Sequence, residues 1–283
     1  MDASRHQDLR VPHDGWILFA ILAAAFFLRI WSVDFGLPYL YHADEPIVVN
    51  HALAYGAGDL NPHFFKIPPL ISYLLFGCYG FYFAIGRAAG LFASTRDLEQ
   101  FFYADPSSFY LIARGVFGVL LGTASVYLLY RLVKRFWDPR AALWASFFLA
   151  VNFLHVRDSH YIYADIPLVF VLLLGMTVIL TLVPPAISER SHRGSNAEFP
   201  PETRGNDNER RTSHLVHSSK PHLLVGVIIG LATAVKYNGL FLAIPYAWVC
   251  VRNVPLKKWL SCWILVGLGA GVGVLTAARA RRE

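Results

Sequence analysis

Long apolar runs alternate with short polar segments along almost the whole chain. The runs occupy residues 15–33, 67–86, 109–133, 141–156, 166–183, 223–251 and 259–277. They are too long and too continuous for ordinary strands. A helix of about 20 residues crosses a hydrocarbon core of roughly 30 Å at about 1.5 Å per residue. The pattern therefore predicts an all-α fold, a polytopic transmembrane helical bundle.

The composition agrees with this prediction and argues against an ordinary soluble domain. Of the 283 residues, 55% are hydrophobic and only 16% are charged, and the mean hydropathy is +0.44. The net charge of +6 does not indicate nucleic-acid binding, because the lysines and arginines lie in short segments between apolar runs, where they orient the spans. The three cysteines form no CxxC pair and give no information on the redox compartment.

Residues 184–221 differ sharply in composition from the runs on either side. Ser, Asn, Arg, Glu, Pro and His dominate this segment, and it has no hydrophobic periodicity. Such a sequence buries too little apolar surface to order itself. We expect residues 1–183 to form an N-terminal transmembrane module with outer loops, 184–221 a flexible cytoplasmic loop, and 222–283 further transmembrane helices.

The distribution of positive charge predicts the topology. Arg5 and Arg10 place the N-terminus inside, and the basic segments 131–140 and 184–221 should also lie inside. Both can do so only if residues 67–86 do not cross the membrane. We therefore expect this run to be an interfacial or re-entrant helix, although a crossing together with an unrecognised span would restore the same parity. The outer face then carries Asp44, Glu45, Lys66 and residues 157–165.

The run at 223–251 is too long for one straight span and is interrupted by the polar sequence Lys-Tyr-Asn-Gly at 236–239. Asn-Gly is a common turn sequence. We expect two short helices joined there, with Lys236 at the outer face.

The first outer loop contains two adjacent acids among aromatic residues, in the sequence Tyr-His-Ala-Asp-Glu-Pro at 41–46. A carboxylate near a membrane surface can act as a general base. The alternative is structural, because acids before a proline and an apolar run often mark the start of a helix. The spacing leaves both interpretations of Asp44 and Glu45 open.

Four segments, in this order, resemble the membrane glycosyltransferases of the GT-C class. They are HADEP at 42–46, GDLNPHFFKIPPL at 58–70, RDSHYIYADIPL at 157–168 and GLATAVKYNG at 230–239. The chain is most similar to the protein O-mannosyltransferase and aminoarabinose-transferase branch, glycosyltransferase family 39, over its N-terminal transmembrane part. The resemblance implies a GT-C-like bundle with interfacial helices in the first outer loop.

The resemblance also implies a reaction, in which a sugar moves from a polyprenyl-phosphate donor to an acceptor hydroxyl with inversion. Asp44 matches the acid that deprotonates the acceptor, with Glu45 beside it. Lys66 matches a lysine at the donor phosphate, where cations stabilise the leaving group. From the residues alone, Lys66 is equally an interfacial lysine that extends its ammonium group to water.

The second outer loop and the 236–239 break supply further candidates for binding the substrate or the lipid phosphate. In the family, a carboxylate at the position of Asp165 faces the first-loop acid, although an aspartate before Ile-Pro also makes a good helix cap. Lys236 either approaches the phosphate or simply ends a short helix. The remaining binding candidates are Arg157, His160 and Tyr163.

Two other polar features have structural explanations at this stage. Arg29 lies within the first apolar run, and we expect it to extend toward the membrane surface rather than pair with an acid. The histidines of the outer face follow no recognised metal-binding spacing. No metal site or cofactor is therefore predicted, while a divalent ion stays open.

The leading hypothesis is an enzyme of the cell membrane, a hexosyl- or pentosyltransferase whose active face points outward. Its partners would be a polyprenyl-phosphate-linked sugar and a protein, lipid or glycan acceptor. The alternatives are a transporter or channel component using Arg29, Arg114, Asp165 and Lys236, or a non-catalytic truncated relative. Transport is disfavoured because the ionisable residues cluster near span ends. We also expect the chain to be incomplete relative to the family, whose members usually continue through more spans.

Overall fold

The computed structural model describes residues 14–182, 219–254, 259–264, 266–268 and 271. Within these ranges every regular element is a helix and no strand occurs, so the predicted all-α bundle is confirmed. The predicted loop at 184–221 lies almost entirely outside the described residues, as do Arg5 and Arg10.

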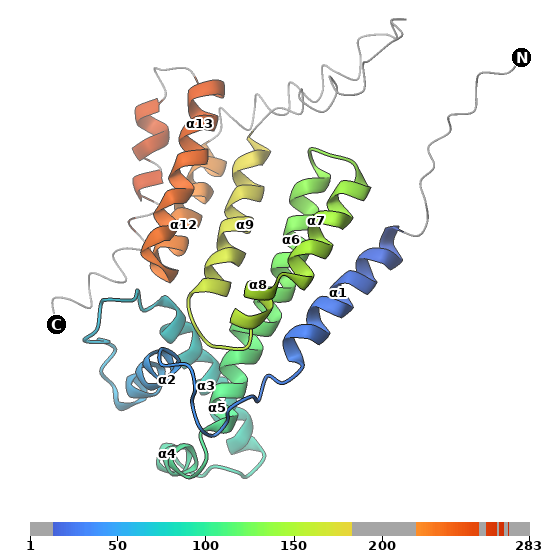
Figure 1. The fold of residues 1–283 in the computed structure, drawn as a ribbon. Helices are drawn as coiled ribbons and strands as arrows, with labels where there is room; N and C mark the ends of the chain where they lie inside the picture. The colour runs from blue at the N-terminus through green and yellow to red at the C-terminus, as the bar shows by residue number, and fades with distance from the viewer. Residues whose placement is uncertain (1–13, 183–218, 255–258, 265, 269–270, 272–283) are drawn as a thin grey trace, which may run out of the picture.

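The main part of the fold is a bundle of roughly aligned helices (Figure 1). α6 packs against both α7 and α9, α1 packs against α7 and α6, and α12 and α13 pack against α9. The helices of this bundle are α1 (Asp14–Ile30), α6 (Leu121–Lys134), α7 (Pro139–Val151), α9 (Asp165–Thr181), α12 (Ser219–Val235) and α13 (Ala243–Asn253).

The elements between α1 and η2 gather at one end of the bundle (Figure 1). They are α2 (Glu45–Ala54), η1 (Tyr55–Ala57), α3 (Leu70–Ala88), α4 (Thr95–Ala104) and α5 (Ser107–Ala113). α2, α3 and α5 contribute to a buried apolar cluster, together with residues after α8 (Phe153–Asp158) and Val235 at the end of α12. This cluster fixes the segment between α1 and α3, which we predict to be the first outer loop, against the bundle.

Among the described residues, two helices are long and apolar enough to cross a membrane, Leu70–Ala88 and Ser107–Lys134. The second joins α5 to α6 through a π-helical segment, η2 (Arg114–Leu120). The first is α3, the run that we expect to be interfacial or re-entrant. α3 packs against α2, α5 and α12, all near the loop end of the bundle. Its length alone would permit a crossing, so the topology stays a prediction.

Two interruptions divide apolar runs. Lys236 is extended (φ −153°, ψ 137°) between α12 and η3 (Tyr237–Leu242), so the predicted break is confirmed. The run at 141–156, expected as one span, is instead divided at Asn152. The Asn152 side chain caps the short helix α8 (Phe153–Asp158) by accepting a hydrogen bond from the His155 N–H at 3.0 Å.

The expectation for Arg29 is wrong. Its side chain is fully buried. The guanidinium donates hydrogen bonds to the carbonyls of Ala25, Leu149 and Ala150 and contacts His155 Nδ1 at 2.9 Å. Arg29 therefore ties α1 to the end of α7, because the carbonyl groups of a helix C-terminus attract a cation.

Candidate active site

A polar cavity of about 230 Å³ opens where the two predicted outer loops meet, and we keep the name outer loops for these segments. The first loop contributes residues at the start of α2, and the second contributes the segment from the end of α8 to the start of α9. Both segments lie within the sequence motifs that resemble the GT-C class, so the fold brings two of these motifs together. The lining residues are His42, Asp44, Arg157, Asp158, Tyr161, Tyr163, Asp165 and Ile166.

Asp44 is the N-cap residue of α2, but its carboxylate does not cap the helix by a side-chain hydrogen bond. The side chain is half-buried and lines the cavity. No Lys, Arg or His nitrogen lies within ion-pair distance of it in the described part of the chain. The predicted helix start at Asp44 and Glu45 is therefore confirmed, but the Asp44 carboxylate makes no cap hydrogen bond and lines the cavity.

Glu45, the next residue, is in a different environment. It is fully buried, and its two carboxylate oxygens accept hydrogen bonds from Arg114 Nε at 2.9 Å and Arg114 Nη2 at 2.7 Å. Glu45 Oε1 also accepts the Ile162 N–H at 2.9 Å. Because these bonds occupy the carboxylate and Glu45 does not line the cavity, its role in the structure is to join the two outer loops.

Three rings form one side of the cavity. The His42 ring lies 4.8 Å from that of Tyr161 and 6.0 Å from that of Tyr163, measured between centroids. Burial and the neighbouring Asp44 carboxylate raise the pKa of the Tyr163 phenol, which keeps it protonated. Tyr163 can therefore donate a hydrogen bond inside the cavity.

The other two acids of the cavity have cationic partners. Asp165 accepts a 2.5 Å hydrogen bond from the Lys236 ammonium, which also lies 5.4 Å from the centre of the Tyr163 ring. Asp158 is paired with Arg157, at 2.7 Å from Nη2. Of the carboxylates that line the cavity, Asp44 is thus the one without a cation.

The comparison with protein families matches one segment of the chain. Residues 67–196 match the dolichyl-phosphate-mannose-protein mannosyltransferase family. This confirms the resemblance to the mannosyltransferase branch of the GT-C class and supports a membrane glycosyltransferase. The comparisons with curated proteins and with solved structures gave no significant match.

The segment that matches the mannosyltransferase family runs from just before α3 past the end of α9. It includes Arg157, Tyr163 and Asp165 on one side of the cavity. Asp44, which lines the cavity, and Lys236, which binds Asp165, both lie outside the matched residues.

Three predicted binding residues do not line the cavity, namely His160, Lys66, and Lys236, which is linked to the cavity through Asp165. His160 instead contacts backbone carbonyls, with Nδ1 2.8 Å from Val156 O and Nε2 2.8 Å from Trp31 O, so it holds the second outer loop against the end of α1. Lys66 is exposed and makes no hydrogen bond or ion pair with the described residues. Its ammonium group is free to meet a ligand.

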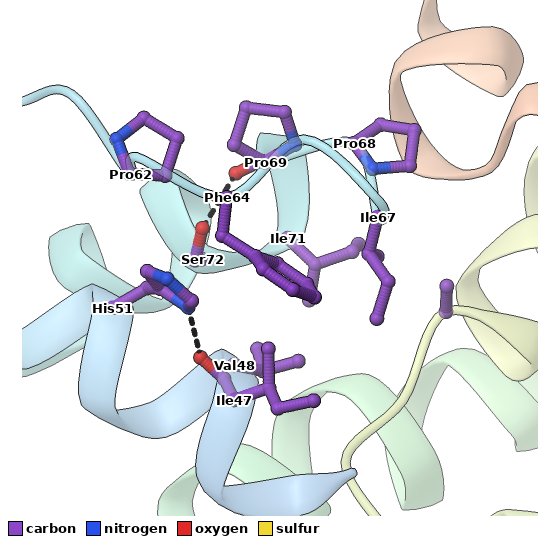
Figure 2. Close-up of a pocket in the computed structure, with 11 residues that line it drawn as sticks. Ile47, Val48, His51, Pro62, Phe64, Ile67, Pro68, Pro69, Ile71 and Ser72 are labelled. Atoms are coloured by element: carbon purple, nitrogen blue, oxygen red, sulfur yellow. Dashed lines mark hydrogen bonds between the residues drawn. The ribbon is translucent and has the colours of Figure 1, made fainter.

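The loop that carries Lys66 covers a second, apolar pocket between α2 and the start of α3. Figure 2 shows Phe64 and Ile67 from this loop facing Ile47 and Val48 of α2. The pocket measures about 20 Å³, which is room for about one water molecule. We therefore regard it as a support for the loop and not as a substrate site.

No group of three or more His, Cys, Asp or Glu side chains among the described residues is placed to hold a metal ion.

No role at the site was predicted from the sequence for Arg114 or Tyr161. Arg114 also donates to the Val33 and Phe35 carbonyls at 2.8 and 2.9 Å, and its guanidinium lies 5.7 Å from the centre of the Tyr161 ring. The sequence feature that could have identified Arg114 is its position inside an apolar run, because an arginine there requires a buried partner.

Proposed function

We propose that this chain transfers a single sugar from a polyprenyl-phosphate donor to an acceptor hydroxyl at the outer face of a multi-pass membrane protein. The observation that carries the proposal is the Asp44 carboxylate, which lines a polar cavity without a cationic partner. The match to the mannosyltransferase family supports the same class of reaction. No cofactor is required.

The proposed reaction needs one base and inverts the configuration at the anomeric carbon of the sugar. As the acceptor oxygen forms its bond to the anomeric carbon, Asp44 takes the hydroxyl proton. The bond between the anomeric carbon and the phosphate oxygen breaks on the opposite side, and its electron pair leaves with the lipid phosphate. The sugar is thereby inverted, and the products are the glycosylated acceptor and the polyprenyl phosphate.

Asp44 suits the role of base better than the neighbouring acids. A carboxylate held by a cation is less available to accept a proton, because the ion pair stabilises its charged form. Glu45, Asp158 and Asp165 are all held in this way. Asp44 is therefore the group that can take the proton without first breaking an ion pair.

The cavity has the features of a small-sugar site. Aromatic rings offer apolar faces to the C–H groups of a sugar, and charged side chains can exchange hydrogen bonds with its hydroxyls. His42, Tyr161 and Tyr163 provide the rings, while Asp165 and Arg157 provide polar groups. These features favour a hexosyl or pentosyl group.

The negative charge that develops on the leaving phosphate requires cations. Lys236 lies at the cavity through its bond to Asp165, and Lys66 lies exposed on the loop that contacts η3. We assign both lysines to the lipid phosphate. His160 and Glu45 position the two outer loops and do not touch the reacting atoms.

The deciding experiment compares Asp44→Asn with the wild-type protein, using labelled polyprenyl-phosphate sugars and a mixture of acceptors. We expect the variant to lose transfer by about 100-fold or more while its thermal stability is unchanged. Glu99→Gln is the control, because Glu99 is an exposed acid of α4 that does not line the cavity. Transfer at the wild-type rate by Asp44→Asn would overturn the assignment of the base.

The same preparation distinguishes the enzyme from a transporter. In the described residues, Arg29 is bound to carbonyls and His155, Arg114 to Glu45, and Lys236 to Asp165, so these groups form separate clusters. We therefore expect no ion flux in vesicles that contain the protein. Flux without sugar transfer from any donor would reject the proposed function.

A further inference from the structure

One hydrogen bond joins the first outer loop to the helical break far along the chain. The Tyr237 hydroxyl donates to the Phe65 carbonyl at 2.7 Å, between residues that are 172 positions apart. Tyr237 directly follows Lys236, and Phe65 directly precedes Lys66. The bond therefore brings together the backbone positions of the two lysines that we assign to the lipid phosphate.

The Tyr237 side of this contact is rigid. The Gly239 N–H donates to the Lys236 carbonyl at 2.8 Å, which closes a tight turn. A Cβ atom at Gly239 would lie 2.1 Å from the backbone carbon of Ala232, so η3 lies directly against α12. Side chains leaving this turn start from a fixed backbone.

The loop that carries Lys66 is held by side-chain contacts. The first half of this loop is held by the Tyr73 hydroxyl, which donates to the Leu60 carbonyl at 2.7 Å, and by the Asp59–His63 pair. In the second half, Figure 2 shows Phe64 and Ile67 turned toward the apolar pocket. Lys66 lies between them in sequence and is exposed.

We propose that Tyr237 is a positioning residue for the lipid phosphate, acting through Lys66. Its hydroxyl holds the Phe65 carbonyl, so the backbone of Lys66 is held near the turn that carries Lys236, and both cations can reach one phosphate. Pre-ordering the loop reduces the conformational entropy that donor binding must overcome. This inference rests on the proposed function, because it takes the ligand to be a polyprenyl phosphate.

The first test is Tyr237→Phe, which removes the hydroxyl and keeps the ring. We expect the Kd for polyprenyl phosphate and the KM for the sugar donor to rise by about 3- to 10-fold, with kcat within about twofold of the wild-type value. Tyr103→Phe is the matched control, since Tyr103 is an exposed tyrosine of α4. That variant should bind the donor like the wild-type protein.

A double-mutant cycle with Lys66→Ala tests whether Tyr237 acts through Lys66. We expect Tyr237→Phe to weaken polyprenyl-phosphate binding in the wild-type background and to have no further effect in the Lys66→Ala background. Equal effects in the two backgrounds would overturn the proposal, because Tyr237 would then act independently of the lysine. An unchanged Kd in Tyr237→Phe alone would also overturn it.

Hydrogen exchange of residues 59–69 provides a measurement that needs no turnover. Tyr237→Phe should speed exchange at residues 64–67, and unchanged exchange there would contradict the proposed restraint. If the wild-type protein transfers no sugar, the proposed function fails, while phosphate binding and exchange still decide the role of Tyr237. Wild-type protein that binds no polyprenyl phosphate would reject the inference itself.

Discussion

Glu45 accepts two hydrogen bonds from the Arg114 guanidinium while both side chains are almost completely buried. The same pair reaches two other segments, because Arg114 donates to the carbonyls of Val33 and Phe35 and Glu45 accepts the Ile162 N–H. One ion pair thus connects the chain after α1, the start of α2, the η2 segment and the second outer loop. The walls of the cavity are held together by groups outside it.

We predict that Glu45→Gln destabilises the protein by about 3–5 kcal/mol, because it leaves the buried Arg114 charge without its partner. Thermal unfolding in detergent measures this loss. Glu99→Gln on α4, where the acid is exposed, serves as the control and should change stability by less than about 0.5 kcal/mol. Wild-type stability in Glu45→Gln would contradict the structural role of the pair.

Two glycines of η2 provide a second, internally controlled prediction. A Cβ atom at Gly118 would lie 2.0 Å from the Ser159 carbonyl oxygen, whereas a Cβ atom at Gly115 meets nothing within 4 Å. Gly118→Ala should lower the free energy of unfolding by about 1–3 kcal/mol or more, because the backbone must move to make room for the added methyl group. Gly115→Ala should be neutral or slightly stabilising. Equal melting temperatures for the two variants would refute the close approach.

The pair between Asp165 and Lys236 is partly exposed, so its stabilising effect should be below about 1 kcal/mol. We expect Asp165→Asn to reduce sugar transfer at least tenfold while melting close to the wild-type temperature. Exchanging the charges, with Asp165→Lys and Lys236→Asp together, should preserve stability without restoring transfer. Full activity in the exchanged protein would show that the pair only holds the fold.

The stability of the turn at residues 59–63 should depend on pH. Hydrogen bonds from the His63 ring and the Asn61 N–H lower the pKa of the Asp59 carboxyl in the folded protein. Its contribution to the turn is therefore complete above the ordinary pKa of about 3.9 and is lost as the pH falls through the lowered value. The Asn61 amide of the wild-type protein should lose its protection from hydrogen exchange over that acidic range, whereas in Asp59→Asn it should not depend on this titration. A ratio of the two Asn61 exchange rates that is independent of pH would contradict the prediction.

The features that the sequence predicted well were local. The helices follow from the length of each apolar run, and the break at Lys236 follows from the Asn-Gly turn beside it. Asp44, Tyr163 and Asp165 were found through motifs, and the fold places all three at one cavity. Short-range patterns were sufficient for these residues.

The features that the sequence missed depend on contacts between distant residues. Glu45 and Arg114 are 69 positions apart, and no periodicity connects them. Arg29 was expected to extend toward the membrane surface because a charge within an apolar run is costly, yet α7 supplies carbonyl groups 120 and 121 positions away. Only the packing of α1 against α7 reveals such partners.

The burial of Arg29 also affects how the protein would respond to its bilayer. A lysine has one ammonium group and could not reproduce the four contacts that the guanidinium makes with α1, α7 and His155. Because these contacts fix α1 to α7, we expect a change in hydrocarbon thickness that tilts one helix to tilt the other. The chain leaving α1 leads directly into the loop of Asp44. We therefore expect membrane thickness to influence the geometry of the cavity.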